Sequence, residues 1–230
     1  MFKTNNLGGW IIPAEAEIPA KTKIPSYSEI GDRCEIGNRC TIGNRCTIGY
    51  GCEIGDGCTF GDGCTFGDGC IIGYGYTIGN RCTIGDGCTI GYGYTIGNRC
   101  TIGNDCTIGD RCTIGNDCTI GDGYTIGDCC TIGDDCTIGD GYTIGDGCKI
   151  GYDCTIGDGC TWRGVKVKSW LTLANVDGSN RQIKIVRSDE GEIKIEAGCF
   201  VGTLDEFIDK AKSEGKFRYV AVISAIAEHV

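Results

Sequence analysis

Residues 95–120 read TIGNRCTIGNDCTIGDRCTIGNDCTI, in which isoleucine returns at every sixth position. The same spacing extends in both directions, because an Ile or Phe occupies every sixth position from Ile12 to Ile156. A period of six fits neither an α-helix, whose period is 3.6, nor one long strand, whose period is 2. Within each repeat Cys-Thr-Ile alternates as a short strand does, and the Gly and Asp or Asn that follow are typical of a turn. We therefore predict a short strand and a corner in every repeat.

The amino-acid composition follows from repetition of this unit. The chain of 230 residues contains 41 glycines and 20 cysteines, but only 3 prolines, 1 methionine and 1 histidine. Its 40% content of hydrophobic residues provides a core to bury, which argues against disorder. The cysteines recur with the period of the repeat. We therefore interpret them as part of the repeat and not as a disulfide framework.

Arranging the repeats in rows of 18 residues sorts the inward positions into columns. One column is cysteine throughout: Cys46, Cys64, Cys82, Cys100, Cys118, Cys136 and Cys154. The other two contain tyrosines in pairs 18 residues apart, Tyr76 with Tyr94 and Tyr124 with Tyr142. A larger ring thus replaces cysteine in two adjacent coils at once, which supports a coil of this length. The outward positions form a matching ladder of Thr47, Thr65, Thr83, Thr101, Thr119, Thr137 and Thr155, and we expect similar ladders on two other faces.

These repeats resemble those of the hexapeptide-repeat proteins, whose fold is an all-β left-handed parallel β-helix with triangular coils of 18 residues. The resemblance implies about eight coils and a prism roughly 40 Å long at the usual spacing of strands. We expect an N-terminal lead-in over residues 1–11 and the β-helix over 12–162, with Trp162 as its lid. A small α+β domain should follow over 163–230.

Residues 163–230 leave the six-residue period. Residues 169–174, 181–188 and 192–197 alternate like strands and are separated by turn residues. The run from Thr203 to Glu206 predicts a capped helix start, Gly215 a helix stop, and 217–230 a second helix. The segment bears only a vague resemblance to short C-terminal domains on uncharacterised phage and bacterial proteins, without a chemical motif. We expect it to cap the open end of the prism, to bind a protein partner or to mediate oligomerisation.

The resemblance makes acyl transfer the first enzymatic hypothesis, because many members of the family move acyl groups from a thioester donor. They generally use a histidine as the base, since its pKa lies near working pH. This chain has one histidine, His229, outside the repeats, and no inserted loop interrupts the run. The three metal-binding histidines of the family's carbonic anhydrase branch are absent. We therefore expect no enzymatic activity, no catalytic residue and no cofactor.

The cysteine columns have two interpretations. Stacked thiolates bind zinc, copper(I) and iron–sulfur clusters well, which makes the column from Cys46 to Cys154 a candidate metal site. A free cysteine is also a small buried apolar residue, and Ala16, Thr22 and Ser28 fill the same position in the first coil. We favour this packing role, although the spacing of stacked strands leaves disulfides between coils open. Cys129, at a turn position, should point outward and is the candidate reactive thiol.

The threonine ladder from Thr47 to Thr155 raises the hypothesis of ice binding, because regular outward threonines on a β-helix resemble some insect antifreeze proteins. Those proteins place two threonines on each strand of one flat face, whereas this chain has one. Threonine is also favourable on any exposed strand. One predicted corner is rich in aspartate, which we interpret as solvated charge that prevents lateral aggregation and not as a calcium site.

Our first functional hypothesis is a rigid spacer that presents the C-terminal domain, as a trimer, an end-to-end assembly or a complex with a protein partner. The second is a β-helix that binds ice or metal along a repetitive face, and the third is an acyltransferase that has lost or relocated its base. A net charge of −10 argues against binding to nucleic acid or anionic membranes. The sequence shows neither a signal peptide nor a membrane-spanning stretch. We expect cytoplasmic synthesis, with a virion or cell-surface structure as a possible destination.

Overall fold

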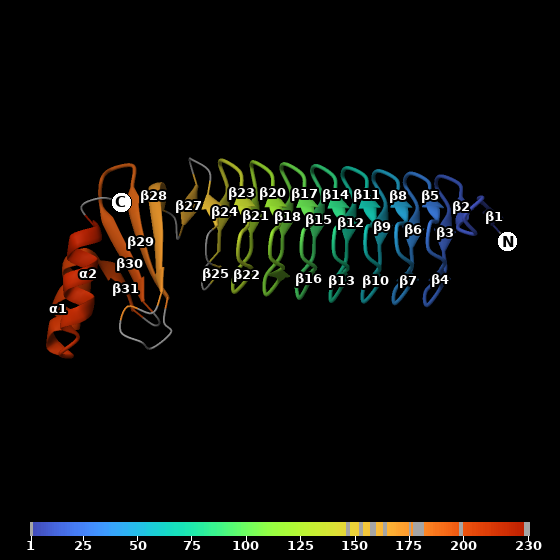
Figure 1. Ribbon diagram of the computed structural model, residues 1–230. Helices are drawn as coiled ribbons and strands as arrows, with labels where there is room; N and C mark the ends of the chain where they lie inside the picture. Colours follow the sequence, from blue (N-terminus) through green and yellow to red (C-terminus); the bar gives the residue numbers. More distant parts are fainter. Residues whose placement is uncertain are drawn as a thin grey trace. The chain divides into compact units, whose positions relative to one another are not determined.

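The computed structural model describes residues 2–145, 148–151, 154–156, 160–162, 165–174, 176, 182–197 and 200–227. The chain divides into two units, Met1–Gly157 and Asp158–Val230. Figure 1 labels most elements of both units.

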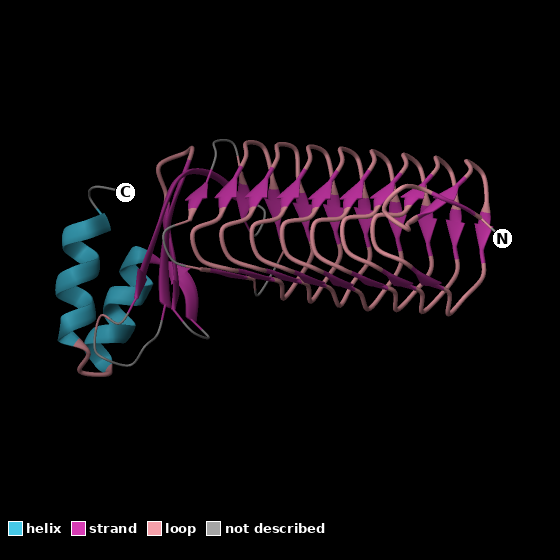
Figure 2. Cartoon of the chain, turned by 45° about the vertical axis from the view of Figure 1, so that its right-hand side comes forward, coloured by secondary structure: helices cyan, strands magenta, loops and turns pink. Residues whose placement is uncertain are grey.

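The first unit is a prism of three parallel sheets, here called faces A, B and C, which the chain visits in turn (Figure 2). On face A, β1 (Lys3–Thr4) pairs antiparallel with the first strand of the face. Face A then contains β2 (Trp10–Ile12), β5 (Glu29–Ile30), β8 (Thr47–Ile48), β11 (Thr65–Phe66), β14 (Thr83–Ile84), β17 (Thr101–Ile102), β20 (Thr119–Ile120), β23 (Thr137–Ile138) and β26 (Thr155–Ile156).

Faces B and C are built in the same way. Face B contains β3 (Glu17–Ile18), β6 (Glu35–Ile36), β9 (Glu53–Ile54), β12 (Ile71–Ile72), β15 (Thr89–Ile90), β18 (Thr107–Ile108), β21 (Thr125–Ile126) and β24 (Thr143–Ile144). Face C contains β4 (Lys23–Ile24), β7 (Thr41–Ile42), β10 (Thr59–Phe60), β13 (Thr77–Ile78), β16 (Thr95–Ile96), β19 (Thr113–Ile114), β22 (Thr131–Ile132) and β25 (Lys149–Ile150). The turns between them are called corners AB, BC and CA after the faces that they join.

The stacking is in register along each face. Thr59 and Phe60 of β10 pair with Thr77 and Ile78 of β13, so that each residue lies against the one 18 positions away. The predicted parallel β-helix is confirmed. Its strands are shorter than the predicted Cys-Thr-Ile unit, since only the Thr-Ile pair has strand geometry while the cysteine precedes it. Within each pair the first residue is exposed and the second buried, which fixes the isoleucines in the core.

Glycine has two different roles at the corners. The first glycine of a corner, such as Gly85, has no room for a side chain, because a Cβ there would lie 2.7 Å from the backbone nitrogen of Asp68 in the preceding coil. The third residue of a corner has a positive φ, as at Gly69 (65°) and Cys129 (58°). Glycine adopts this conformation freely, and the other residues found there accept its strain.

The second unit contains an antiparallel sheet in the order β27 (Thr161–Trp162), β28 (Val165–Ala174), β29 (Gln182–Ser188), β30 (Ile193–Ala197) and β31 (Phe200–Thr203). Two helices follow, α1 (Leu204–Ser213) and α2 (Phe217–Ala227). The three strands and two helices predicted from sequence are present, whereas β31 was not predicted. The predicted capping box is confirmed, since the Thr203 hydroxyl accepts from the Glu206 amide at 3.3 Å and the Glu206 carboxylate accepts from the Thr203 amide at 2.8 Å.

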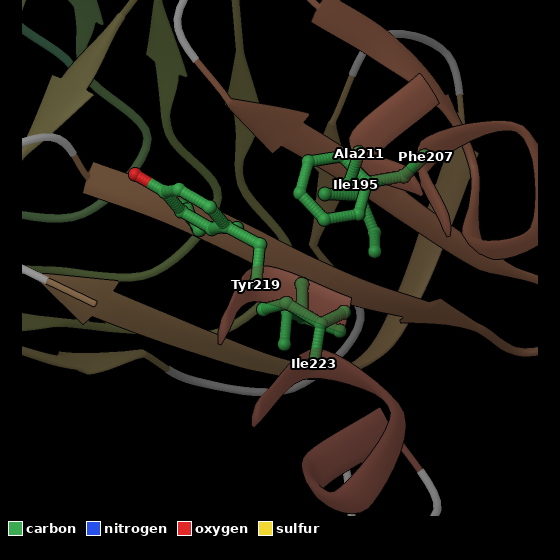
Figure 3. Close-up of a cluster of buried hydrophobic side chains, with 7 residues drawn as sticks. Ile195, Phe207, Ala211, Tyr219 and Ile223 are labelled. Atoms are coloured by element: carbon green, nitrogen blue, oxygen red, sulfur yellow. The ribbon is translucent and has the colours of Figure 1, made fainter. Parts of the chain in front are cut away.

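A separate hydrophobic core holds the second unit together. Ile195 of the sheet packs with Phe207, Ala211, Tyr219 and Ile223 of the helices (Figure 3), and Ile183 and Ile185 belong to the same buried cluster. Arg187 on β29 donates a hydrogen bond of 2.8 Å to the carbonyl of Ala227 at the end of α2. A cation at this position stabilises a helix, because the helix dipole places negative charge at its C-terminus.

Candidate functional site

The interior thiols of the first unit act as hydrogen-bond donors as well as core residues. In the column from Cys46 to Cys136 every thiol is about 1% exposed or less, while Cys154 is half-buried. The Sγ of Cys64 donates to the carbonyl oxygen of Gly43 at 3.2 Å, and that of Cys82 donates to Gly61 at 3.4 Å. Each thiol therefore satisfies an inward-facing corner carbonyl of the preceding coil, a role that the sequence interpretation based on size missed.

The pKa values of the interior thiols reflect their burial and their hydrogen bonds to one another. Burial raises the pKa of Cys58 to about 11, whereas a hydrogen bond from Cys64 lowers that of Cys46 to about 7. The described part of the chain contains no group of three or more His, Cys, Asp or Glu side chains arranged to hold a metal ion. The cysteines of the columns between Cys34 and Cys136 are free thiols. Reaction of a core thiol would require the coil to open, because a reagent must reach the sulfur.

The tyrosines that replace cysteine stack as predicted but differ in hydrogen bonding. The rings of Tyr76 and Tyr94 lie 5.2 Å apart between centroids and within 10° of parallel. The hydroxyl of Tyr76 donates to the carbonyl of Ile54 at 2.7 Å. The hydroxyl of Tyr94 is buried and has no hydrogen-bond partner among the residues that the structure describes. Burial raises the pKa of both hydroxyls well above the usual value, so both are neutral.

The candidate ligand face on face A is an exposed, regular ladder. Its threonines from Thr47 to Thr137 are exposed, and each pairs in register with the next, as Thr83 does with Thr101. The side chain of Thr155 lies outside the described residues. The expected ladder on face B is wrong for its first half, because Glu17, Glu35, Glu53 and Ile71 occupy those outward positions. These substitutions are visible in the sequence itself.

The aspartates and asparagines of the corners bind backbone amides. The Oδ1 of Asn98 accepts from the amide of Asn116 at 2.9 Å, and that of Asp86 accepts from the amide of Asn104 at 2.7 Å. The same bond recurs at all three corners and always joins residues 18 positions apart. The acidic corner is therefore a structural ladder as well as a charged edge. Recurrence of Asp or Asn at this one position in the sequence was the signal that could have revealed it.

Arginines line an open groove along corner CA. Arg45 lies over the ring of Tyr27 at 5.8 Å from its centroid, and Arg99 forms an ion pair of 3.5 Å with Asp117. Arg81 lies between them in the same groove. These contacts are solvent-exposed and contribute little stability, because water screens them.

The remaining predicted site residues do not gather into one place. Cys129 is exposed at corner BC, as predicted, whereas the adjacent Cys130 is buried. His229 and Cys199 lie outside the described residues, as does the side chain of Trp162. No helix in the described ranges combines the length and the apolar character that crossing a bilayer requires.

Comparison with known protein families identifies the family to which the repeats belong. Residues 15–50, 35–68 and 93–123 match the family model described as bacterial transferase hexapeptide (six repeats), and residues 123–151 match that described as hexapeptide repeat of succinyl-transferase. No curated protein and no solved structure matches the chain. The matched segments fall within the stacked coils of the first unit, in which Ile, Gly and Cys occupy equivalent positions. The chain is a hexapeptide-repeat β-helix protein.

Proposed function

We propose that this protein is a structural scaffold without catalytic activity, in which the β-helix is a rigid rod that carries the C-terminal domain. The observation that carries the proposal is the unbroken register of the faces from β2 to β26. A site for catalysis is usually a local departure from such regularity, whereas stiffness requires that the regularity persist.

The hydrogen bonding of the coils supports a mechanical role. On the strands, the amide of Thr83 donates to the carbonyl of Cys64 at 2.9 Å, and at the corner the amide of Gly63 donates to the carbonyl of Asn80 at 2.9 Å. Corner side chains add a further bond between the same coils. Adjacent coils are therefore joined at both strands and corners, so that bending the rod would strain several hydrogen bonds at once.

Acyl transfer is the second candidate, because one family model that matches carries the name of succinyl-transferase. That chemistry needs a base whose pKa lies near neutrality, and the chain contains a single histidine, His229. The outward side chains of the coils are mainly threonine and charged residues, and the strand positions offer hydroxyls without a neighbouring imidazole. These features favour the scaffold.

The two functions are separated by an assay of acyl transfer from acetyl-coenzyme A and succinyl-coenzyme A to a panel of amines and alcohols. Released coenzyme A must be measured by chromatography, because a thiol-reactive dye would also react with exposed Cys129. The scaffold proposal predicts release equal to that without protein. Protein-dependent turnover that disappears in the His229→Ala variant would overturn it.

A further inference from the structure

Three neighbouring apolar side chains are exposed where face B meets corner BC. Ile71, Tyr74 and Tyr92 are 51%, 51% and 54% exposed. The two tyrosine rings contact each other, with centroids 4.6 Å apart. Ile71 occupies a position that is threonine on the strands that follow it along face B. Tyrosine is enriched in protein interfaces, where its ring provides apolar area at a small entropic cost.

Other exposed tyrosines of the prism carry an arginine from their own chain. Arg33 lies over Tyr50 at 5.6 Å from its ring centroid, and Arg45 lies over Tyr27. Arg33 occupies the third corner position of the coil that precedes Tyr50, and the same position before Tyr74 and Tyr92 is occupied by Gly57 and Gly75. No described cation lies over these two rings, which contact each other. The outer surfaces of the two rings are therefore available for contact with another molecule.

Charges are arranged around this tyrosine pair in a complementary order. Arg39 lies two coils before Tyr74 and Arg111 one coil after Tyr92, and neither forms an ion pair with a residue that the structure describes. Glu53 lies one coil before Tyr74 and Asp128 two coils after Tyr92. All four side chains are exposed. Reversing the order of coils about the midpoint of the pair brings these two basic positions onto the two acidic ones, and it also places Asp56 opposite Asp110.

From this order we infer that a second copy of the chain packs antiparallel against corner BC, with a two-fold axis between Tyr74 and Tyr92. Tyr74 then faces the partner's Tyr92, and Arg111 faces the partner's Glu53. Arg39 faces the partner's Asp128. Such an interface is self-complementary, as two-fold symmetry requires, because each attractive pair occurs twice.

Corner BC disfavours the parallel arrangement. Parallel copies related by a two-fold axis along the corner would place Arg39, Arg111 and Asp128 each against its own equivalent, and like charges directly opposite one another are destabilising. Glu17, Glu35 and Glu53 form a stack of like charges on consecutive strands of face B. The antiparallel arrangement brings the stack opposite the partner's Thr143, Thr125 and Thr107, whose hydroxyls can donate hydrogen bonds to carboxylates.

The expected affinity is modest. The coils from Lys21 to Cys129 span roughly 30 Å along corner BC at the usual strand spacing. An edge of this length suits an interface at the lower end of the standard range of about 1,200–2,000 Å² in total. The pairing is independent of the scaffold proposal, because it concerns the outer surface and not catalysis. If the chain is monomeric and does not catalyse acyl transfer, only the pairing is refuted. If the chain is dimeric and catalyses acyl transfer, only the scaffold proposal is refuted.

Mass in solution tests the pairing. Sedimentation equilibrium of the full chain over a range of concentrations should show a monomer–dimer equilibrium. In the double variant Tyr74→Asn/Tyr92→Asn, the dissociation constant should rise at least about tenfold, because aromatic contacts of this kind contribute about a factor of ten. Asparagine occupies the equivalent position at Asn38, so that the coil should keep its fold, which circular dichroism checks.

Tyr50→Asn, at the equivalent position of corner AB, is the matched control and should dimerise like the unaltered chain. A monomer at all concentrations, a trimer, or equal loss of dimer in the control would each overturn the inference.

Cross-linking tests the antiparallel direction. Antiparallel pairing brings Arg39 opposite the partner's Cys129, so the Arg39→Cys variant should form a disulfide-linked dimer under mild oxidation by oxidised glutathione. The unaltered chain should not, because its two copies of Cys129 would lie several coils apart. Parallel pairing predicts the reverse, with the unaltered chain linked through Cys129. The Arg33→Cys variant at corner AB is the control, and a linked dimer there, or none with Arg39→Cys, would refute the arrangement.

Discussion

Replacement by phenylalanine should change the free energy of unfolding in opposite directions at two stacked tyrosines of one column. Tyr76→Phe removes a hydroxyl that donates to Ile54 at 2.7 Å, whereas Tyr94→Phe removes one without a described partner. Both variants keep their rings, and therefore the contact at 5.2 Å between centroids. The comparison isolates the hydrogen bond, because ring size, column and burial are matched.

The expected magnitudes follow from the two environments. Tyr76→Phe should lower the free energy of unfolding by about 1 kcal/mol, the usual net value of one hydrogen bond. The loss should not be larger, because the carbonyl of Ile54 keeps its bond of 2.9 Å from the amide of Gly73. Tyr94→Phe should raise the free energy of unfolding by about 1 kcal/mol, since a buried hydroxyl without a partner costs about 1–3 kcal/mol in lost solvation. The two variants should thus differ by about 2 kcal/mol or more.

Native-state hydrogen exchange is the suitable assay, because a solenoid opens coil by coil and a single unfolding midpoint averages over all of them. The amides of Thr95 and Thr113 donate to the carbonyls of Tyr76 and Tyr94, and so report the opening of these coils. Protection of both amides should fall in Tyr76→Phe and rise in Tyr94→Phe. A shift in the same direction in both variants would refute the assignment of the unsatisfied hydroxyl to Tyr94.

Three further predictions test the corners, the period and the thiols. Gly85→Ala should destabilise by several kcal/mol because its Cβ meets backbone, whereas Gly69→Asn should change stability by no more than about 1 kcal/mol, as thermal unfolding would show. Deleting residues 97–114 should leave a folded rod shorter by about 4.8 Å in small-angle scattering, while deleting 97–111 should unfold it, because only the first preserves the columns. Urea titrations should show stability falling between about pH 9 and pH 11, since unfolded thiols ionise near 8.5 whereas Cys58 keeps its proton to about pH 11. Cys58→Ala should reduce that fall, and an unchanged pH profile would contradict the role of burial.

The coils could be predicted from the sequence because every repeat has the same pattern of buried, exposed and turn residues. Ile12 to Ile156 set the period, and the spacing of Tyr76 and Tyr94 sets the length of a coil. Side-chain bonds such as that from Asn98 to the next coil were missed, although the 18-residue spacing placed the two residues together. A period indicates which residues stack and which are buried, but it does not indicate which stacked side chains hydrogen-bond.

The C-terminal domain was less predictable because its pairings are not repeated. Local alternation identified β29 and β30, and the Thr203–Glu206 pattern identified the start of α1. The strand β31 was missed because FVGT is short, contains a glycine and runs directly into a helix cap. The Lys184–Glu196 ion pair across β29 and β30, 3.6 Å long, also depends on a register that no local pattern reveals.

The paired tyrosines have a consequence for folding fidelity. A chain of near-identical repeats can misfold by slipping six residues, since isoleucine would again meet isoleucine and thiol would again meet thiol. Such a slip would separate Tyr76 from Tyr94 and force each ring into a space shaped for cysteine, where overpacking costs about 1–3 kcal/mol. The tyrosine rings therefore distinguish coils that are otherwise nearly identical, and they make the native register more stable than registers shifted by six residues.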